Sequence, residues 1–226
     1  MERGQFVSIV GGNGSGKTTL LNIICGSVPI DGGEVRVAGK SIEKMPDYKR
    51  YLTMGRVYQN PSLGTCPSLT MLENLSLADH KGRHFGLTRG VNKGRVDFYR
   101  QELAALGLGL ENKLDVKMGS LSGGQRQAVA LLMATMTPLE FLILDEHTAA
   151  LDPTTAETLM ELTGRIVQEK GLTAMMVTHN LRYALEYGDR LLMMNRGKAV
   201  LDKAGAEKQR LSTEEILEVF NRISME

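Results

Sequence analysis

The chain has 226 residues, the length of one domain or of one domain with an added lobe. Its net charge of +1 shows no basic excess, so charge gives no reason to expect a nucleic-acid partner. Its two cysteines have neither a disulfide framework nor a metal-site spacing, and no apolar run approaches the roughly 18 residues that indicate a membrane span.

The first half of the chain predicts short strands, a glycine-rich loop and then a long helical segment. The expected strands are residues 5–10, 32–40 and 54–59. Residues 16–26 are expected to form a helix that ends at Gly26. From about 70 to 120 the patterns are helical, and Thr70 with Glu73 has the spacing of a capping box.

The second half alternates strands and helices, which predicts an α/β fold with a mostly parallel sheet. The expected elements are strands at 141–146 and 172–179, a hairpin at 189–202, and helices at 154–170, 180–187 and 212–223. The helix-rich segment interrupts this alternation, so we expect an inserted helical lobe at about 62–136 inside a core of 1–61 and 137–226. The basic stretch 80–95 within the lobe is interpreted as a solvated connector.

Residues 11–18, GGNGSGKT, fit the phosphate-loop pattern G-x-x-x-x-G-K-[ST] between a predicted strand and a predicted helix. Glycines let backbone N–H groups turn toward phosphate oxygens, and the helix N-terminus adds partial positive charge. The expected nucleotide-contacting residues here are Gly11, Gly12, Asn13, Gly14, Ser15, Gly16, Lys17, Thr18 and Thr19. Lys17 should reach the outer phosphates and Thr18 should bind Mg²⁺. A dinucleotide loop beginning at Gly12 would need glycine where Lys17 stands, so that interpretation fails.

Two acids end the apolar strand FLILDE, where ligands of α/β sheets bind. Asp145 can hold Mg²⁺ directly or through water, and Glu146 can polarise an attacking water. His179 ends the next strand and is a candidate γ-phosphate contact, although a lone histidine is more often structural. Gln59 ends another strand and is a candidate sensor of the metal and the water. The alternative is that the two acids merely cap a loop.

These motifs together resemble those of the nucleotide-binding subunit of ABC transporters. The matching elements, in the order of that family, are GGNGSGKT, Gln59, LSGGQ at 121–125, FLILDE, AALD at 149–152 and His179. The resemblance implies a P-loop NTPase fold, a mostly parallel sheet with an inserted helical subdomain, and a single ATPase domain over 1–226. It also implies binding and hydrolysis of ATP with Mg²⁺.

The LSGGQ stretch contains no catalytic acid or base, and the resemblance implies that it serves a second chain. In the family it opens a helix whose N-terminus binds the γ-phosphate of ATP held by another copy in a head-to-tail dimer. The residues that this role assigns are Ser122, Gly123, Gly124 and Gln125. Small residues allow close approach, and the helix dipole favours the anion. Asp152 is placed by the resemblance at the same dimer seam.

Two positions depart from the family pattern. His147 stands where many members have proline. Family members also carry two further strands and an adenine-stacking aromatic residue upstream of the phosphate loop, whereas here the upstream aromatic is Phe6, within the first strand. We therefore expect adenine to lack this platform, as in a chain that starts late.

The resemblance implies an ATPase subunit that powers a membrane transporter. The run DEHTAALDP is typical of bacterial importers for amino acids or related small solutes. The implied partners are a second copy, a permease docked near Gln59 and the helical lobe, and a solute-binding protein, at the cytoplasmic face of the membrane. One alternative is a chromosome or DNA-repair ATPase, which would carry heptad coiled coils or zinc-binding cysteine pairs. Another is a regulatory ATP-binding module, against which the intact Lys17 and Glu146 argue.

Overall fold

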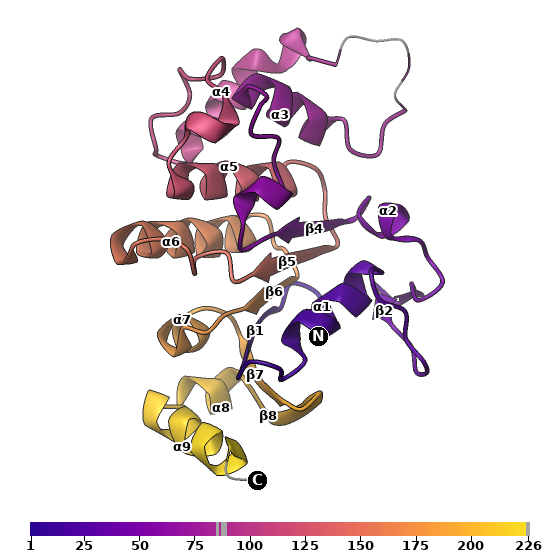
Figure 1. The fold of residues 1–226 in the computed structure, drawn as a ribbon, viewed down its shortest axis with the longest axis vertical. Coiled ribbons are helices and arrows are strands. Elements are labelled where there is room, and N and C mark those ends of the chain that lie inside the picture. Colours follow the sequence, from indigo (N-terminus) through magenta and orange to yellow (C-terminus); the bar gives the residue numbers. More distant parts are fainter. Residues whose placement is uncertain (85, 87–89, 225–226) are drawn as a thin grey trace. The chain divides into compact units, whose positions relative to one another are not determined.

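A computed structural model describes residues 1–84, 86 and 90–224, and part of the expected connector at 80–95 therefore lies outside the described residues. The chain forms two compact units (Figure 1). The first unit comprises residues 1–54, 140–146 and 164–226, and the second comprises 55–139 and 147–163.

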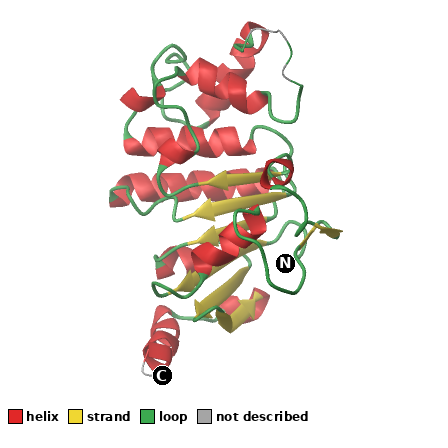
Figure 2. Ribbon diagram, turned by 45° about the vertical axis from the view of Figure 1, so that its right-hand side comes forward, coloured by secondary structure: helices red, strands yellow, loops and turns green. Residues whose placement is uncertain are grey.

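The first unit is built on a sheet in which β5, β6, β1, β7 and β8 lie side by side in that order (Figure 2). The strands are β1 (Phe6–Gly11), β5 (Phe141–Asp145), β6 (Ala174–Val177), β7 (Arg190–Asn195) and β8 (Lys198–Ala204). Strands β5, β6, β1 and β7 pair in parallel, and β8 pairs antiparallel with β7. The mostly parallel sheet and the hairpin expected from the sequence are both present.

Apolar side chains on these strands build the core of the first unit. All residues of β1 are buried, as expected of a central parallel strand covered on both faces. Val7 and Ile9 pack with Leu21 of α1 (Lys17–Cys25) in one cluster, while Val10 packs with Ile216 in another. These contacts fix β1, and with it the loop that follows.

The described part of this unit has four further helices, of which the longest has 12 residues. They are α2 (Asp47–Arg50), α7 (Leu181–Glu186), α8 (Gly205–Gln209) and α9 (Thr213–Ser224). The longer α6 (Pro153–Glu169) begins in the second unit and ends in the first.

The prediction of a single strand at 32–40 is wrong in detail. The structure has two short antiparallel strands, β2 (Arg36–Val37) and β3 (Lys40–Ser41). Ala38 and Gly39 between them both have positive φ, 49° and 76°, so the chain turns tightly instead of continuing as a strand.

The second unit is largely helical. Its elements are η1 (Pro61–Leu63), α3 (Met71–Asp79), η2 (Lys93–Arg95), α4 (Val96–Ala105), η3 (Met118–Ser120) and α5 (Gly123–Thr135), together with most of β4 (Met54–Val57). Met71, Leu75, Tyr99 and Leu103 are fully buried and form its core. The Thr70 capping box at the start of α3 is present as expected.

The second unit is larger than the lobe expected at 62–136. It also takes in the residues around Gln59 and the first turns of α6. Within this unit, Gln127 Nε2 of α5 donates to Tyr58 O at 2.7 Å, which ties the end of β4 to the helices. Among the residues that the structure describes, no helix is long and apolar enough to cross a membrane.

Candidate active site

The phosphate loop lies between β1 and α1, as the motif requires. Gly16 is the N-cap of α1 and has φ +99°, a left-handed conformation that favours glycine. A Cβ at Gly16 would lie 3.2 Å from Gly197 Cα, so a side chain would also crowd the β7–β8 turn. Backbone N–H groups at the start of such a helix can donate to an anion.

Lys17 projects its ammonium group into this loop. Its Nζ donates to Gly11 O at 2.8 Å and to Gly12 O at 3.0 Å, and it lies 3.5 Å from Ser15 Oγ. Burial lowers the pKa of Lys17, while the carboxylates of Glu146 and Asp145 act in the opposite direction. Both acids therefore act electrostatically on Lys17.

Glu146 follows β5 in a strained backbone conformation. Its φ is +47°, which is uncommon for a non-glycine residue and concentrates at functional sites. Its N–H donates to Val177 O at 2.9 Å, so β6 holds the strained residue in place. Its Oε1 lies 2.7 Å from His179 Nε2, and the Glu146 side chain is 19% exposed. The first unit thus brings together the loop, Asp145, Glu146 and His179.

The β7–β8 turn supports the phosphate loop, and the sequence did not predict this contact. Gly197 N donates to Ser15 O at 2.9 Å. A glycine at position 197 indicates a turn in sequence terms, but nothing local shows that the turn contacts the phosphate loop, because the two segments are far apart in the chain.

The signature stretch lies in the second unit, at the start of α5. Ser122 Oγ accepts from Gln125 N at 3.2 Å, and Gln125 Oε1 accepts from Ser122 N at 3.2 Å, which makes a capping box. Ser122 and Gly123 are exposed, whereas Gly124 is buried. Gln59 belongs to this unit as well, so its expected approach to Asp145 stays a prediction.

His147, one of the two departures from the family pattern, is a buried residue of the second unit. Its Nε2 lies 3.0 Å from Thr163 Oγ1, and that hydroxyl donates its single hydrogen to Leu159 O at 2.7 Å. The Thr163 oxygen must therefore accept from His147, so the ring carries a hydrogen on Nε2. Burial lowers the pKa of His147 to about 4. The histidine fastens the segment after Glu146 to α6.

We expect this histidine to make stability fall in mild acid. A native pKa of about 4 lies below the ordinary 6.5 of the unfolded chain, so the unfolded state binds the extra proton as pH falls from 6.5 to 4. Linkage then predicts that the free energy of unfolding drops by about 2 kcal/mol between pH 7 and pH 5 because of this residue. Urea unfolding of the wild type and of His147→Gln at both pH values measures it. Equal pH slopes for the two chains would contradict the assignment.

Phe6 does not provide an adenine platform. It is 6% exposed within β1, and its N–H donates to Asp189 Oδ2 at 2.8 Å. No group of three or more His, Cys, Asp or Glu side chains that could hold a metal is found in the described part of the chain. A magnesium site built from Thr18 and Asp145 does not need such a group, because phosphate oxygens and water complete it.

A phosphate loop between a central parallel strand and a helix, facing two acids at the end of a neighbouring strand, defines a P-loop NTPase. The family model for the ABC transporter matches residues 1–149. The chain belongs to this family, and it is an ATPase of the ABC type.

Relatives with known names support the assignment to this family. A tyrosine transport ATP-binding protein of Clostridioides difficile is 48% identical over 97% of this chain and 87% of its own length. A thiamine import ATP-binding protein of Vibrio parahaemolyticus is 36% identical over 88% of this chain and 80% of its own length.

Solved structures agree as well. An ATP-binding cassette determined as a dimer in a post-hydrolysis state with ADP and Pi has a TM-score of 0.75 and 32% identity, covering 90% of this chain and 87% of that one. CbiO1 from Clostridium perfringens, part of the transporter complex CbiONQ, has a TM-score of 0.77 and 27% identity, covering 98% of this chain and 85% of that one.

Proposed function

We propose that this ATPase powers the import of a small solute of the amino-acid class, with tyrosine as the first candidate. The observation that carries the proposal is the 48% identity, over 97% of the chain, with a tyrosine transport ATP-binding protein. The DEHTAALDP run supports it, since it resembles the corresponding run of importers for amino acids or related small solutes.

In this proposal the phosphate loop binds the phosphates of ATP, with Lys17 as the charged contact. Thr18 is exposed in the first turn of α1, and Asp145 acts electrostatically on Lys17 from the end of β5. A hydroxyl and a carboxylate are the hard oxygen donors that Mg²⁺ prefers, so these residues fit the ion and would hold it beside the phosphates. Bound there, Mg²⁺ would neutralise phosphate charge.

Glu146 is proposed to orient and deprotonate the attacking water. His179 donates from Nε2 to its carboxylate at 2.7 Å, which holds the group in one orientation. Gln59 is proposed to complete the surroundings of the water and the metal. Holding reacting groups in place supplies a large part of the barrier reduction in phosphoryl transfer.

We further propose that two copies sandwich ATP head to tail, with Ser122 and Gly123 facing the γ-phosphate held by the other copy. Both residues are exposed at the N-terminus of a 13-residue helix, where partial positive charge favours an anion. The dimer would drive permease subunits at the cytoplasmic face of the membrane, together with a solute-binding protein. The helical lobe within one ATPase domain is the proposed contact with the permease.

Uptake measurements test the proposed solute. The gene is deleted in its own organism, and the uptake of radiolabelled tyrosine and of radiolabelled thiamine is compared with that of the parent strain. We expect tyrosine uptake to be lost, to return with the wild-type gene and to stay lost with Glu146→Gln. Thiamine uptake should not change. Loss of thiamine uptake with tyrosine uptake intact would contradict the amino-acid assignment.

A further inference from the structure

The two glycines of the signature stretch have different surroundings within the second unit. Gly123 is exposed, and a Cβ there would lie 3.5 Å from Leu151 Cδ2, an ordinary contact. Gly124 is buried, and a Cβ there would overlap the Cγ2 methyl group of Thr155. The other nearby Thr155 atoms would be at acceptable distances, Cβ at 3.6 Å and Oγ1 at 3.9 Å. One methyl group of the chain's own α6 therefore excludes a side chain at Gly124.

Thr155 is itself held by Asp152. The Thr155 N–H donates to Asp152 Oδ1 at 3.1 Å. Hydrogen bonds from the Thr155 side chain and backbone lower the pKa of Asp152, the former most strongly. A rotation of Thr155 about χ1 that moved the methyl group away from Gly124 would also move the hydroxyl group away from Asp152. The contact between Gly124 and Thr155 thus joins the start of α5 to the Asp152 loop.

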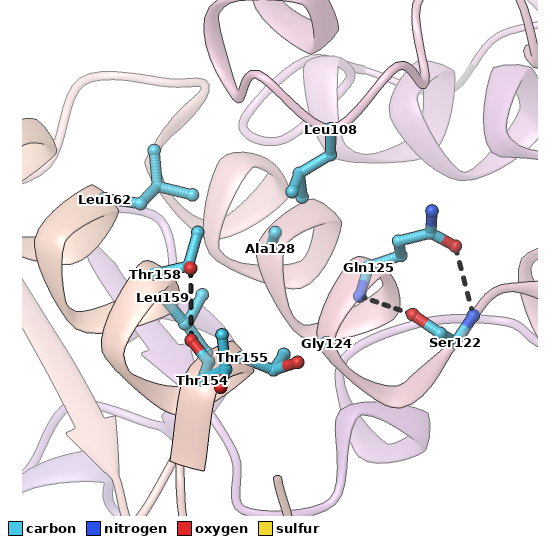
Figure 3. A pocket seen from close by; sticks show the side chains of 10 residues that line it. All are labelled: Leu108, Ser122, Gly124, Gln125, Ala128, Thr154, Thr155, Thr158, Leu159 and Leu162. Atoms are coloured by element: carbon cyan, nitrogen blue, oxygen red, sulfur yellow. Dashed lines mark hydrogen bonds between the residues drawn. The ribbon is translucent and has the colours of Figure 1, made fainter. Parts of the chain in front are cut away.

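A cavity lies beside this contact. Beside it, α5 and α6 are separated by a cavity of about 160 Å³ lined by Leu108, Ala128 and Leu159 among others (Figure 3). In Figure 3, Gly124 and Thr155 lie next to each other, while Leu108 and Leu162 line a part of the cavity farther away. Gly124 and Thr155 thus make a close approach between the starts of α5 and α6.

We propose that Thr155 is a positioning residue for ATP hydrolysis, which sets the signature residues Ser122 and Gly123 relative to the Asp152 loop by packing against Gly124. This inference rests on the proposed role of the signature stretch. The inference gives the two glycines different roles. Gly124 lacks a side chain because Thr155 of the same chain packs against it, whereas Gly123 is exposed and can face another molecule.

The first variant is Gly124→Ala in the full-length chain. Alanine is a better helix former than glycine, so helix propensity cannot explain a loss, and the double variant below tests whether the overlap with Thr155 does. We expect kcat to fall by about tenfold or more, because small displacements of positioned groups have large effects on rate. The KM for ATP should change by less than about twofold, since the phosphate loop keeps its contacts. The Tm should also fall, by about 2–8 °C, as overpacked cores do.

The deciding variant is Gly124→Ala combined with Thr155→Ser, which deletes the overlapping methyl group and keeps the hydroxyl group. We expect Tm to recover and kcat to return to within about threefold of the Thr155→Ser chain, because the remaining Thr155 atoms would be at ordinary van der Waals distances of 3.6 Å and 3.9 Å from the new Cβ. Thr155→Val is the matched control. It keeps a γ-methyl group and loses the hydroxyl, so it should not rescue Gly124→Ala.

The two readouts separate the inference from the proposed function. If Tm recovers in the double variant but kcat does not, Thr155 does not position the signature and the inference is overturned. If Gly124→Ala lowers Tm and leaves kcat unchanged, the packing does not position the signature and the inference is overturned, whereas the proposed role of the signature is tested separately by the pairing of Lys17→Ala with Ser122→Arg. If Gly124→Ala changes neither quantity, the close packing itself is refuted.

Discussion

Because Glu146 is the proposed general base, we expect its replacement with glutamine to lower ATP turnover by about 10²–10⁴-fold, the usual effect of losing such a group. Glutamine keeps the size of the side chain, and its carbonyl oxygen can still accept the hydrogen bond that His179 Nε2 makes at 2.7 Å. What disappears is the negative charge. ATP binding should persist, because Lys17 and the loop are unchanged, and ATP-bound dimers should accumulate. Steady-state hydrolysis and size-exclusion chromatography with ATP measure the two effects.

Glu140→Gln is the matched control for this variant. Glu140 is an exposed residue that precedes β5, at the end of the strand opposite Glu146. The Glu140→Gln substitution also removes one negative charge, but at a position outside the phosphate loop. Turnover should therefore stay within about twofold of the wild type, as for surface substitutions. Unchanged turnover in Glu146→Gln would remove Glu146 from the catalytic role, whatever the control shows.

The parts of the site that could be predicted from the sequence are those whose chemistry lies in consecutive residues. Lys17 and Thr18 end the phosphate-loop motif at 11–18, and Asp145 and Glu146 come at the end of a recognisable buried strand. The Thr70 capping box is predictable for the same reason, because donor and acceptor are three residues apart. Each of these features depends only on local geometry that the residue types impose.

The parts that could not be predicted depend on contacts between distant segments. The bond from Gly197 to Ser15 requires the register of β7 against β1, and the bond from His147 to Thr163 requires the packing of α6. The burial of Gly124 against Thr155 has the same origin. Spacing along the chain carries no record of these pairings, so the sequence marks His147 as a departure from the family pattern without giving its cause.

The positive φ of Glu146 could not be predicted from the sequence either. A glutamate at this position carries no local signal of strain, since the backbone is held by its bond to Val177 and the side chain by His179. Both partners come from β6 and the residues after it, which lie beside β5 only in the folded sheet. Strain that surrounding elements impose is a property of tertiary structure.

If Ser122 serves the ATP of another copy, two inactive variants should restore each other. A Lys17→Ala chain loses a charge-assisted phosphate contact and keeps its signature stretch. A Ser122→Arg chain keeps its phosphate loop, but the long charged side chain blocks the exposed start of α5. Each homodimer should be nearly inactive. A heterodimer has one complete site, formed by the loop of the second chain and the signature of the first, and it should hydrolyse more ATP than either homodimer.

Two different affinity tags, one on each chain, allow heterodimers to be isolated, and full-length chains assembled with their permease provide the relevant dimer. Ser122→Arg also removes a helix cap, which costs about 1 kcal/mol, so thermal unfolding of every chain is recorded alongside its activity. A chain with both substitutions is the control. Paired with wild type it leaves no composite site complete, because the wild-type loop meets the blocked signature and the wild-type signature meets the altered loop. Isolated heterodimers that hydrolyse no more ATP than the homodimers would show that each site works within one chain or that both sites must act together.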